Sequence, residues 1–213
     1  MFEVVLTNSS RNILLNLNDE LNRLKFYLGG GSGLALQLGH RISEDLDFFT
    51  NEKFQPEILA NYLATKFRYE ETMVSEGTLY CLLNEVKVSF IYYPISCLYP
   101  PIEFHKIKVA DWRDLIAEKF KTLSQRGSKR DFYDIYFGYT LGNLTISDGI
   151  AILKKRFAGT GINYYHILKS LVYFEDADKE PELILLKPVA WETVKNFFRQ
   201  NLYEFERYLL TED

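Results

Sequence analysis

The periodicity of the apolar residues changes near residue 110, and this change most limits the folds open to the chain. Before it, helical patterns alternate with short β-rich segments, among them 69–75 and 78–84, which Glu76-Gly77 can join as a hairpin. After it, the pattern is helical with turn-forming breaks. The sequence therefore predicts an α+β (mixed α/β) fold: an α/β domain with a small mixed sheet over 1–110, followed by a helical bundle over 111–213.

The α/β part is predicted element by element from apolar spacing and turn residues. Helices are expected where apolar residues recur at helical spacing and strands where β-formers cluster. The expected helices are 9–24, with Ser9 or Ser10 as N-cap, a short one capped by Ser32 and ending near Gly39, and one from Pro56 to Phe67. The expected strands are 26–28, 45–50, 69–75, 78–84, 86–93 and 104–109.

Composition excludes several classes of protein. The 213 residues are 47% hydrophobic and 25% charged, which is typical of a globular protein rather than a disordered one. No apolar run reaches the 18 or more residues of a membrane span, and two cysteines without metal-type spacing favour a reducing cytoplasm. With 25 Lys and Arg against 29 Asp and Glu, the net charge of −4 argues against a protein that coats nucleic acid.

A glycine turn follows the predicted strand 26–28. Gly29, Gly30 and Gly31 lead into Ser32 and a helix, so backbone N–H groups at the helix N-terminus could meet an anionic phosphate. The turn matches neither common nucleotide motif: the dinucleotide pattern needs Gly where Leu34 stands, and the P-loop needs Gly-Lys at 34–35.

Two aspartates, Asp45 and Asp47, stand on the next predicted strand. Alternation along a strand places residues 45 and 47 on one face, about 7 Å apart. Two such carboxylates can converge on Mg²⁺ or Mn²⁺, whose other ligands are water and substrate phosphates. An acidic strand end that only faces water is the alternative, and the upstream glycine turn favours the metal site.

A basic segment, 111–130, carries six Lys or Arg and three Asp or Glu. If the helices around Gly127 were continuous, Lys119, Arg126, Arg130 and Asp134 would share one face. The alternatives are a solvated helix face for the basic residues and, for Asp131, a capping box with Ser128. The aromatic residues that follow Asp131 are expected in the helix core.

Two blocks of the sequence resemble one family. The runs GGGSGLALQLGHRISEDLDFFT (29–50) and DLIAEKFKTLSQRGSKRDFYDIY (114–136) are similar to motifs of the AbiEii/AbiGii toxin-type nucleotidyltransferases, a branch of the DNA polymerase β-like superfamily. The resemblance covers about the first 140 residues. It implies a polymerase-β-like fold, a toxin paired with an antitoxin, contact of Lys119 with the nucleotide, and a site completed by Arg130-Asp131.

The sequence departs from the superfamily pattern at the third carboxylate. The resemblance leads us to expect Asp on a later strand, flanked by apolar residues, yet the matching position holds Ser89. Glu85 is too far along that strand to replace it. This substitution places catalysis, or the choice of acceptor, in question.

The leading hypothesis is an enzyme that transfers a nucleoside monophosphate from an NTP to a hydroxyl of an RNA or tRNA end or of a protein. The alternatives are a nucleotide- or partner-binding module without catalysis and a small-molecule nucleotidyltransferase. The expected catalytic residues are Asp45, Asp47, Lys119 and Asp131, with the two strand aspartates as metal ligands. The expected nucleotide-binding residues are Gly30, Gly31, Ser32, Arg41, Lys119, Arg126 and Arg130.

Overall fold

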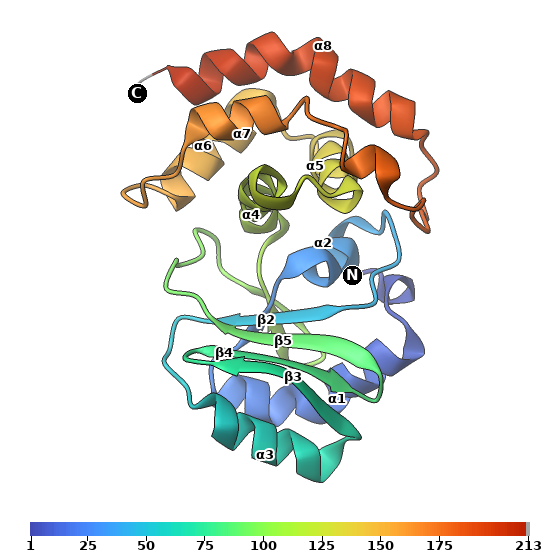
Figure 1. Cartoon of the computed structure of the whole chain (residues 1–213), viewed down its shortest axis with the longest axis vertical. Helices are drawn as coiled ribbons and strands as arrows, with labels where there is room; N and C mark the ends of the chain where they lie inside the picture. Colours follow the sequence, from blue (N-terminus) through green and yellow to red (C-terminus); the bar gives the residue numbers. More distant parts are fainter. Residues whose placement is uncertain (212–213) are drawn as a thin grey trace. The chain divides into compact units, whose positions relative to one another are not determined.

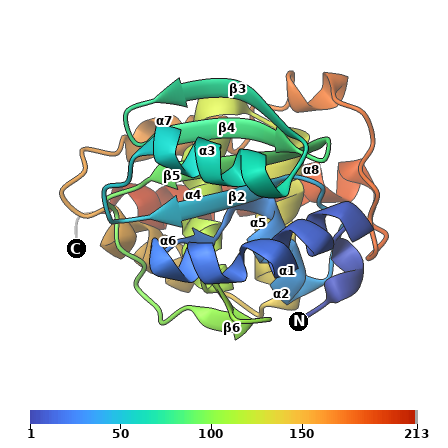
Figure 2. The same ribbon diagram turned by 90° about the horizontal axis from the view of Figure 1, so that it is seen from below.

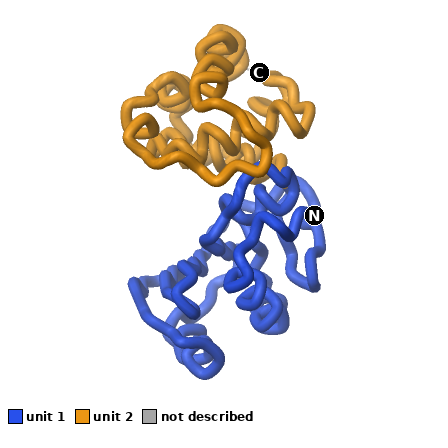
Figure 3. The backbone as a smooth tube through the Cα atoms, turned by 90° about the vertical axis from the view of Figure 1, so that its right-hand side faces the viewer, with its two compact units in different colours: residues 1–111 blue, residues 112–213 orange. Residues whose placement is uncertain are grey.

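The computed structural model of the chain describes residues 1–211. The chain divides into two compact units, residues 1–111 and residues 112–213, coloured blue and orange in Figure 3. Each unit has a hydrophobic core of its own elements.

The first unit is built on one seven-stranded mixed sheet. Its helical elements are η1 (Glu3–Val5), α1 (Asn8–Arg23), α2 (Gly30–Leu38) and α3 (Pro56–Lys66). Its strands are β1 (Tyr27–Leu28), β2 (Leu46–Thr50), β3 (Tyr69–Ser75), β4 (Thr78–Leu83), β5 (Val86–Tyr92), β6 (Ile102–Phe104) and β7 (Ile107–Val109). The strand order is β3-β4-β5-β2-β1-β7-β6; β2 and β5 are parallel, as are β1 and β7.

Helices cover both faces of this sheet. Figure 1 shows α2 on one face, above β2, and α1 and α3 on the other; Figure 2 looks onto the face that carries α1 and α3. Between the layers, Phe48 and Phe90 stack with ring centroids 5.3 Å apart, and Phe26 meets Phe90 edge-on at 5.4 Å. The alternation in β2 buries Leu46, Phe48 and Thr50 and leaves the residues between them half-buried, which turns Asp47 away from this core.

Three details of the predicted elements were wrong. The predicted strand 104–109 is a hairpin, β6 and β7, because His105 and Lys106 both adopt positive φ and reverse the chain. The second helix begins at Gly30 with Gly29 as N-cap, so Ser32 lies inside it. The first helix is capped by Thr7, whose hydroxyl accepts from the N–H of Ser10.

The second unit is entirely helical. It consists of α4 (Trp112–Arg126), α5 (Lys129–Leu141), α6 (Ile146–Arg156), α7 (Tyr164–Ser170), η2 (Ala177–Lys179) and α8 (Trp191–Leu210). Helix α4 packs against α5, α6 and α7, and α8 packs across α5, α6 and α7, as Figure 1 shows. No helix in residues 1–211 combines the length and hydrophobicity of a membrane span.

Aromatic rings fill the core of this bundle. Phe132 contacts Phe198 and Trp191, with centroid distances of 5.2 and 5.6 Å, and Phe132, Tyr133 and Phe137 are all buried. The prediction that the aromatic residues after Asp131 form helix core is therefore confirmed for these three. The predicted α+β fold, a mixed sheet followed by helices, is also confirmed.

Candidate functional site

The glycine turn and Asp47 meet at the N-terminus of α2. Gly30 has φ +56°, which a glycine adopts without strain, and a Cβ on this residue would overlap the Oδ2 of Asp47. The N–H of Gly29 also donates to the backbone oxygen of Asp47 at 2.8 Å. The missing side chain at Gly30 thus lets a strand carboxylate lie against the first residue of a helix.

Arg41 occupies the other side of the same turn. Its side chain is buried, its Nη1 donates to the oxygen of Ile42 at 3.1 Å, and its Nη2 lies where a Cβ of Gly31 would stand. A buried guanidinium beside the first turn of a helix adds positive charge where the helix dipole already favours an anion. The Asp47 carboxylate therefore lies beside the backbone of residue 30, and the Arg41 guanidinium lies beside the backbone of residue 31.

Ser32 fixes the loop that carries Asp45. Its hydroxyl donates to the backbone oxygen of Asp45, and the hydroxyls of Ser32 and Ser43 are 2.9 Å apart. Ser10 donates to the oxygen of Glu44 at 2.8 Å. Ser32 is predicted to bind phosphate, yet in this arrangement its proton is used to position Asp45.

The neighbouring strand carries no carboxylate beside Asp47. Strands β2 and β5 pair in parallel, with Asp47 directly opposite Ser89. Glu85 lies in the turn before β5 and pairs with Arg68 at 2.9 Å, where both side chains are exposed. The register therefore puts Ser89 at the position predicted for the third carboxylate.

Two carboxylates, those of Asp45 and Asp47, lie at the start of β2. Asp45 precedes β2 by one residue, Asp47 is its second residue, and both are half-buried. In residues 1–211, no group of three or more His, Cys, Asp or Glu is arranged to hold a metal ion. The two aspartates and the open glycine backbone suit Mg²⁺, which commonly uses one or two protein carboxylates and completes its shell with water and substrate phosphates.

The second unit holds a cluster of buried charges between α4 and α5. The Nζ of Lys119 lies 2.8 Å from Asp131 Oδ1 and 2.7 Å from Asp134 Oδ2. Arg126 binds Asp131 with two nitrogens: Nε to Oδ2 at 2.7 Å and Nη2 to Oδ1 at 2.9 Å. Lys119 and both aspartates are buried, whereas the Arg126 side chain is 57% exposed.

These cations control the ionisation of Asp131. Burial alone would raise its pKa, but the charge of Lys119, together with the hydrogen bonds and charge of Arg126, outweighs burial and holds the pKa below the usual range. Asp131 is thus a buried anion with both oxygens hydrogen-bonded to cations.

Ser128 and Asp131 do not form the capping box that was the alternative for Asp131. Ser128 is the N-cap of α5, but its hydroxyl bonds to Glu180 at 3.0 Å, and Glu180 also accepts from the N–H of Lys129 at 2.9 Å. A residue distant in sequence therefore caps this helix, which leaves the Asp131 side chain to the charge cluster.

The structure brings three of the predicted residues of the second unit together. Lys119, Arg126 and Asp131 are in one cluster, joined by Asp134. Arg130 stands next to Asp131 in α5 and is exposed. Gly127, with φ +59°, separates α4 from α5, so the single continuous helix on which these residues would share one face does not form.

A second buried ion cluster was not predicted. Arg156 of α6 donates to Asp114 at 2.7 Å and to Glu118 at 2.7 and 2.9 Å. Asp114 and Glu118 are four residues apart on α4, so they share a helix face. That spacing was a usable signal, but the sequence did not show which cation they would meet.

Comparison with known proteins finds a relative in sequence and two in fold. A protein of Aquifex aeolicus, aq_aa25, is 34% identical over 184 residues, which span 84% of this chain and 87% of that one. Two solved Helicobacter pylori structures have the same fold: a proposed nucleotidyltransferase (TM-score 0.56, 17% identity, 96% of this chain and 95% of that chain) and JHP933 (0.51, 15%, 98% and 91%).

A family model gives the family directly. The model described as "Nucleotidyl transferase AbiEii toxin, Type IV TA system" matches residues 12–78 and 55–209. The two matches together include the glycine turn, both strand aspartates and the Lys119 cluster. The chain therefore belongs to the AbiEii toxin family of nucleotidyltransferases, which is assigned to type IV toxin–antitoxin systems.

Proposed function

We propose that this protein is a metal-dependent nucleotidyltransferase that transfers a nucleoside monophosphate from an NTP to an acceptor hydroxyl and releases pyrophosphate. The observation that carries the proposal is the meeting of Asp47 with Gly30, and of Arg41 with Gly31, at the start of α2. A carboxylate for a cation and a guanidinium for a phosphate then stand at adjacent backbone positions.

Residues of the first unit bind the triphosphate in this proposal. The backbone at Gly30 and Gly31 and the Arg41 guanidinium contact phosphate oxygens, while Asp45 and Asp47 hold Mg²⁺ or Mn²⁺. Such an ion, when bound, neutralises phosphate charge and orients the groups that react. Ser32 acts by holding the loop of Asp45 in place.

Residues of the second unit supply further positive charge. Lys119, Arg126 and Arg130 contact the nucleotide, and Asp131 positions two of these cations rather than touching the reacting atoms.

The acceptor follows from the family rather than from the geometry. The family name describes a toxin of a toxin–antitoxin system, and a toxin that modifies an RNA end, including that of tRNA, or a protein in the cytoplasm would fit this role. A cognate antitoxin is then the expected partner.

The test is transfer of labelled nucleotide to total RNA and to total protein, with each of the four NTPs and Mg²⁺ or Mn²⁺. Asp45→Asn with Asp47→Asn should lower labelling by on the order of 100-fold or more. Glu44→Gln is the matched control, because Glu44 is an exposed carboxylate next to Asp45; it should label like the wild type. Labelling that survives the double substitution would sink the proposal.

A second candidate is a nucleotide-binding module without transfer. Ser89 opposite Asp47 favours it, since a third carboxylate for the acceptor is missing at that position. Titration calorimetry would then show NTP binding that Asp45→Asn and Asp47→Asn weaken, with no pyrophosphate released in the presence of RNA or protein.

A further inference from the structure

The second unit has two adjoining pockets, and the smaller one lies on the side of α4 that faces away from Lys119. Residues 119 and 121 are two positions apart, so their side chains leave the helix about 200° apart. Lys119 meets α5, whereas Lys121 lines a pocket of about 480 Å³ with Phe157, Thr160 and other residues. The charge cluster of the proposed catalytic site and this pocket are therefore separate.

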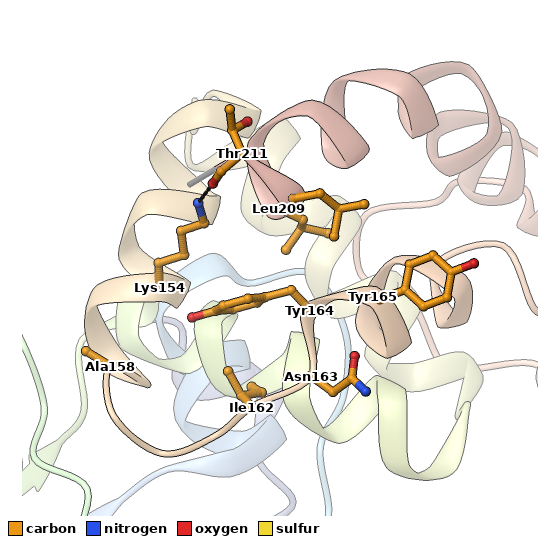
Figure 4. Close-up of a pocket in the computed structure, with 9 residues that line it drawn as sticks. Lys154, Ala158, Ile162, Asn163, Tyr164, Tyr165, Leu209 and Thr211 are labelled. Carbon is orange, nitrogen blue, oxygen red and sulfur yellow. Dashed lines mark hydrogen bonds between the residues drawn. The ribbon is translucent and has the colours of Figure 1, made fainter. Parts of the chain in front are cut away.

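The larger pocket measures about 580 Å³ and shares Ile162 with the smaller one. In Figure 4 the ring of Tyr164 extends across it toward Lys154, whose Nζ donates to the backbone oxygen of Thr211 at 2.6 Å. The ring of Tyr165 points the other way, and this residue is 55% exposed. The Nζ of Lys169 lies over the Tyr165 ring, 4.5 Å from its centroid. Two tyrosine rings of α7 thus lie near two lysines, Lys154 in the last turn of α6 and Lys169 on α7.

The charge of this surface is one-sided. Among the described residues that line the two pockets there is no Asp or Glu, and Lys121 and Lys154 are both present. The sequence from 149 to 174, which forms most of the walls, has no Asp or Glu, although the chain as a whole is acidic. Of its four Lys or Arg, Arg156 is buried and paired with Asp114 and Glu118, which leaves Lys154, Lys155 and Lys169. Such a surface is complementary to a polyanion.

The smaller pocket also offers directed hydrogen bonds. The Nε2 of His166 lies 2.8 Å from the backbone oxygen of Ser124. Because a carbonyl oxygen only accepts, Nε2 carries the proton, and in the neutral ring Nδ1 is left as an acceptor. Ser124, Gln125 and Thr160 add groups that donate and accept.

We infer that this surface, defined by the linings of the two pockets together with Lys169, binds single-stranded RNA. Stacking faces beside lysines are what a single strand requires, since each base offers a planar face and each linkage a negative charge. Bases of a duplex are already stacked on one another and cannot enter such pockets. The inference deepens the proposed function and rests on it for the choice of RNA, which would serve as the acceptor.

The experiment uses the full-length protein without NTP and a fluorescent oligouridine of about 12 nucleotides. We expect anisotropy to report binding that weakens with salt, with Lys121→Gln plus Lys169→Gln lowering the slope of log K against log salt by about 0.7 for each lost phosphate contact. Tyr165→Ala should weaken binding by about fivefold or more. Circular dichroism checks that each variant is folded.

Matched controls lie elsewhere in the second unit. Lys179, whose side chain is 75% exposed, and Tyr203, which is 79% exposed, line neither pocket. Lys179→Gln and Tyr203→Ala should bind like the wild type. The inference is overturned if folded surface variants bind oligouridine as tightly as the controls, or if an RNA duplex or polyglutamate competes as well as unlabelled oligouridine.

This assay separates the inference from the proposed function. If oligouridine binds at this surface and no acceptor is ever labelled, the RNA site stands and the transferase proposal fails. If labelling of an acceptor depends on Asp45 and Asp47 but the surface variants bind RNA normally, the transferase stands and the RNA site fails.

Discussion

The hydroxyl of Tyr139 is buried in the core of the second unit and has no hydrogen-bond partner among residues 1–211. A buried polar group without a partner costs about 1–3 kcal/mol, because it has lost its bonds to water. Burial also raises the pKa of this phenol, so the group remains neutral. The ring itself packs against Phe120 and Phe205, so the ring stabilises the fold and the hydroxyl opposes it.

Tyr139→Phe should therefore raise the free energy of unfolding, by about 1 kcal/mol. Urea denaturation of the wild type and variant measures the change. Tyr133→Phe is the control, since the Tyr133 hydroxyl bonds to the oxygen of Val189 at 3.4 Å; that variant should not be stabilised. Equal effects of the two substitutions would contradict the assignment.

A substitution at Gly149 tests the position of the Tyr139 hydroxyl in a second way. A Cβ on this glycine would overlap the Tyr139 oxygen, so Gly149→Ala should lower stability by about 1–3 kcal/mol. In the double variant with Tyr139→Phe, the loss should be smaller than the sum of the single effects, and a double-mutant cycle isolates this coupling.

The charge cluster at Asp131 makes stability depend on pH. Its folded pKa is lowered, so its contribution is fully present above the unfolded pKa, about 3.9, and is lost as pH falls through the lower folded value. Asp131→Asn should lower the free energy of unfolding at pH 7 by about 3 kcal/mol. The reason is that the buried Lys119 pairs with both Asp131 and Asp134, and the variant removes one of these two carboxylates.

The difference in free energy of unfolding between the wild type and Asp131→Asn should become smaller as the pH is lowered below about 4. In that range the Asp131 carboxylate of the wild type takes up a proton, first in the unfolded chain. Urea denaturation from pH 7 to about pH 3 measures it. A gap that stays constant over that range would show that the charge of Asp131 is not what stabilises the fold. Lys119 variants need the same folding check before any loss of activity is assigned to catalysis.

At the scale of elements, the pairing of β2 with β5 gives the sharpest test of the metal site. Ser89 lies opposite Asp47 and is half-buried, so Ser89→Asp would place a third carboxylate beside the two on the chain segment 45–47. We expect Mn²⁺ to bind this variant about tenfold more tightly or better, because each added anionic oxygen ligand strengthens a hard-cation site. Calorimetric titration with Mn²⁺ measures the affinity.

Two comparisons keep this result interpretable. Ser89→Asn adds similar bulk without charge and should leave Mn²⁺ affinity near that of the wild type. The gain from Ser89→Asp should disappear when Asp47→Asn is added. Unchanged affinity in the folded Ser89→Asp variant would show that residues 47 and 89 do not serve one ion.

The elements also show what the sequence could reveal. The hairpin at Glu76-Gly77, the strand of Asp47 and the helix break at Gly127 follow from local signals that the structure confirms. The turn at His105-Lys106 was missed because neither residue usually signals positive φ. The cap of α5 was missed because Glu180 comes from far along the chain.

The features of the candidate site also fall into two groups, those set by local sequence and those set by packing between elements. Glycine spacing and strand alternation predicted the backbone turn and the two aspartates, and these are local features. The close approach of the Asp47 side chain to Gly30 and the ion pairs of Asp131 with Lys119 and Arg126 depend on packing between elements. Spacing in the sequence alone could not specify them.

At the scale of the whole molecule, charge is unevenly divided between the units. Residues 1–111 contain 10 Lys or Arg and 14 Asp or Glu, a net −4, and residues 112–213 contain 15 of each, a net charge of zero. The net charge of −4 of the whole chain therefore comes from the first unit. A neutral second unit with an acid-free segment at 149–174 opposes the approach of an RNA strand less than the acidic first unit does.

This division predicts how the two units behave when they are produced separately. Each has its own core, with Phe48 and Phe90 in the first and Phe132 and Phe198 in the second, so each should unfold cooperatively in urea. The first unit contains both strand aspartates and should retain Mn²⁺ binding that Asp47→Asn weakens. The second should retain oligouridine binding that Tyr165→Ala weakens.

Transfer of nucleotide should then need both units, because Asp45 and Asp47 lie in one and Lys119 in the other. Neither fragment alone should label an acceptor, and mixing them should restore labelling in proportion to how far they associate. Labelling by residues 1–111 alone, at the rate of the full chain, would show that Lys119 and its cluster stabilise the helical unit without contributing to the reaction.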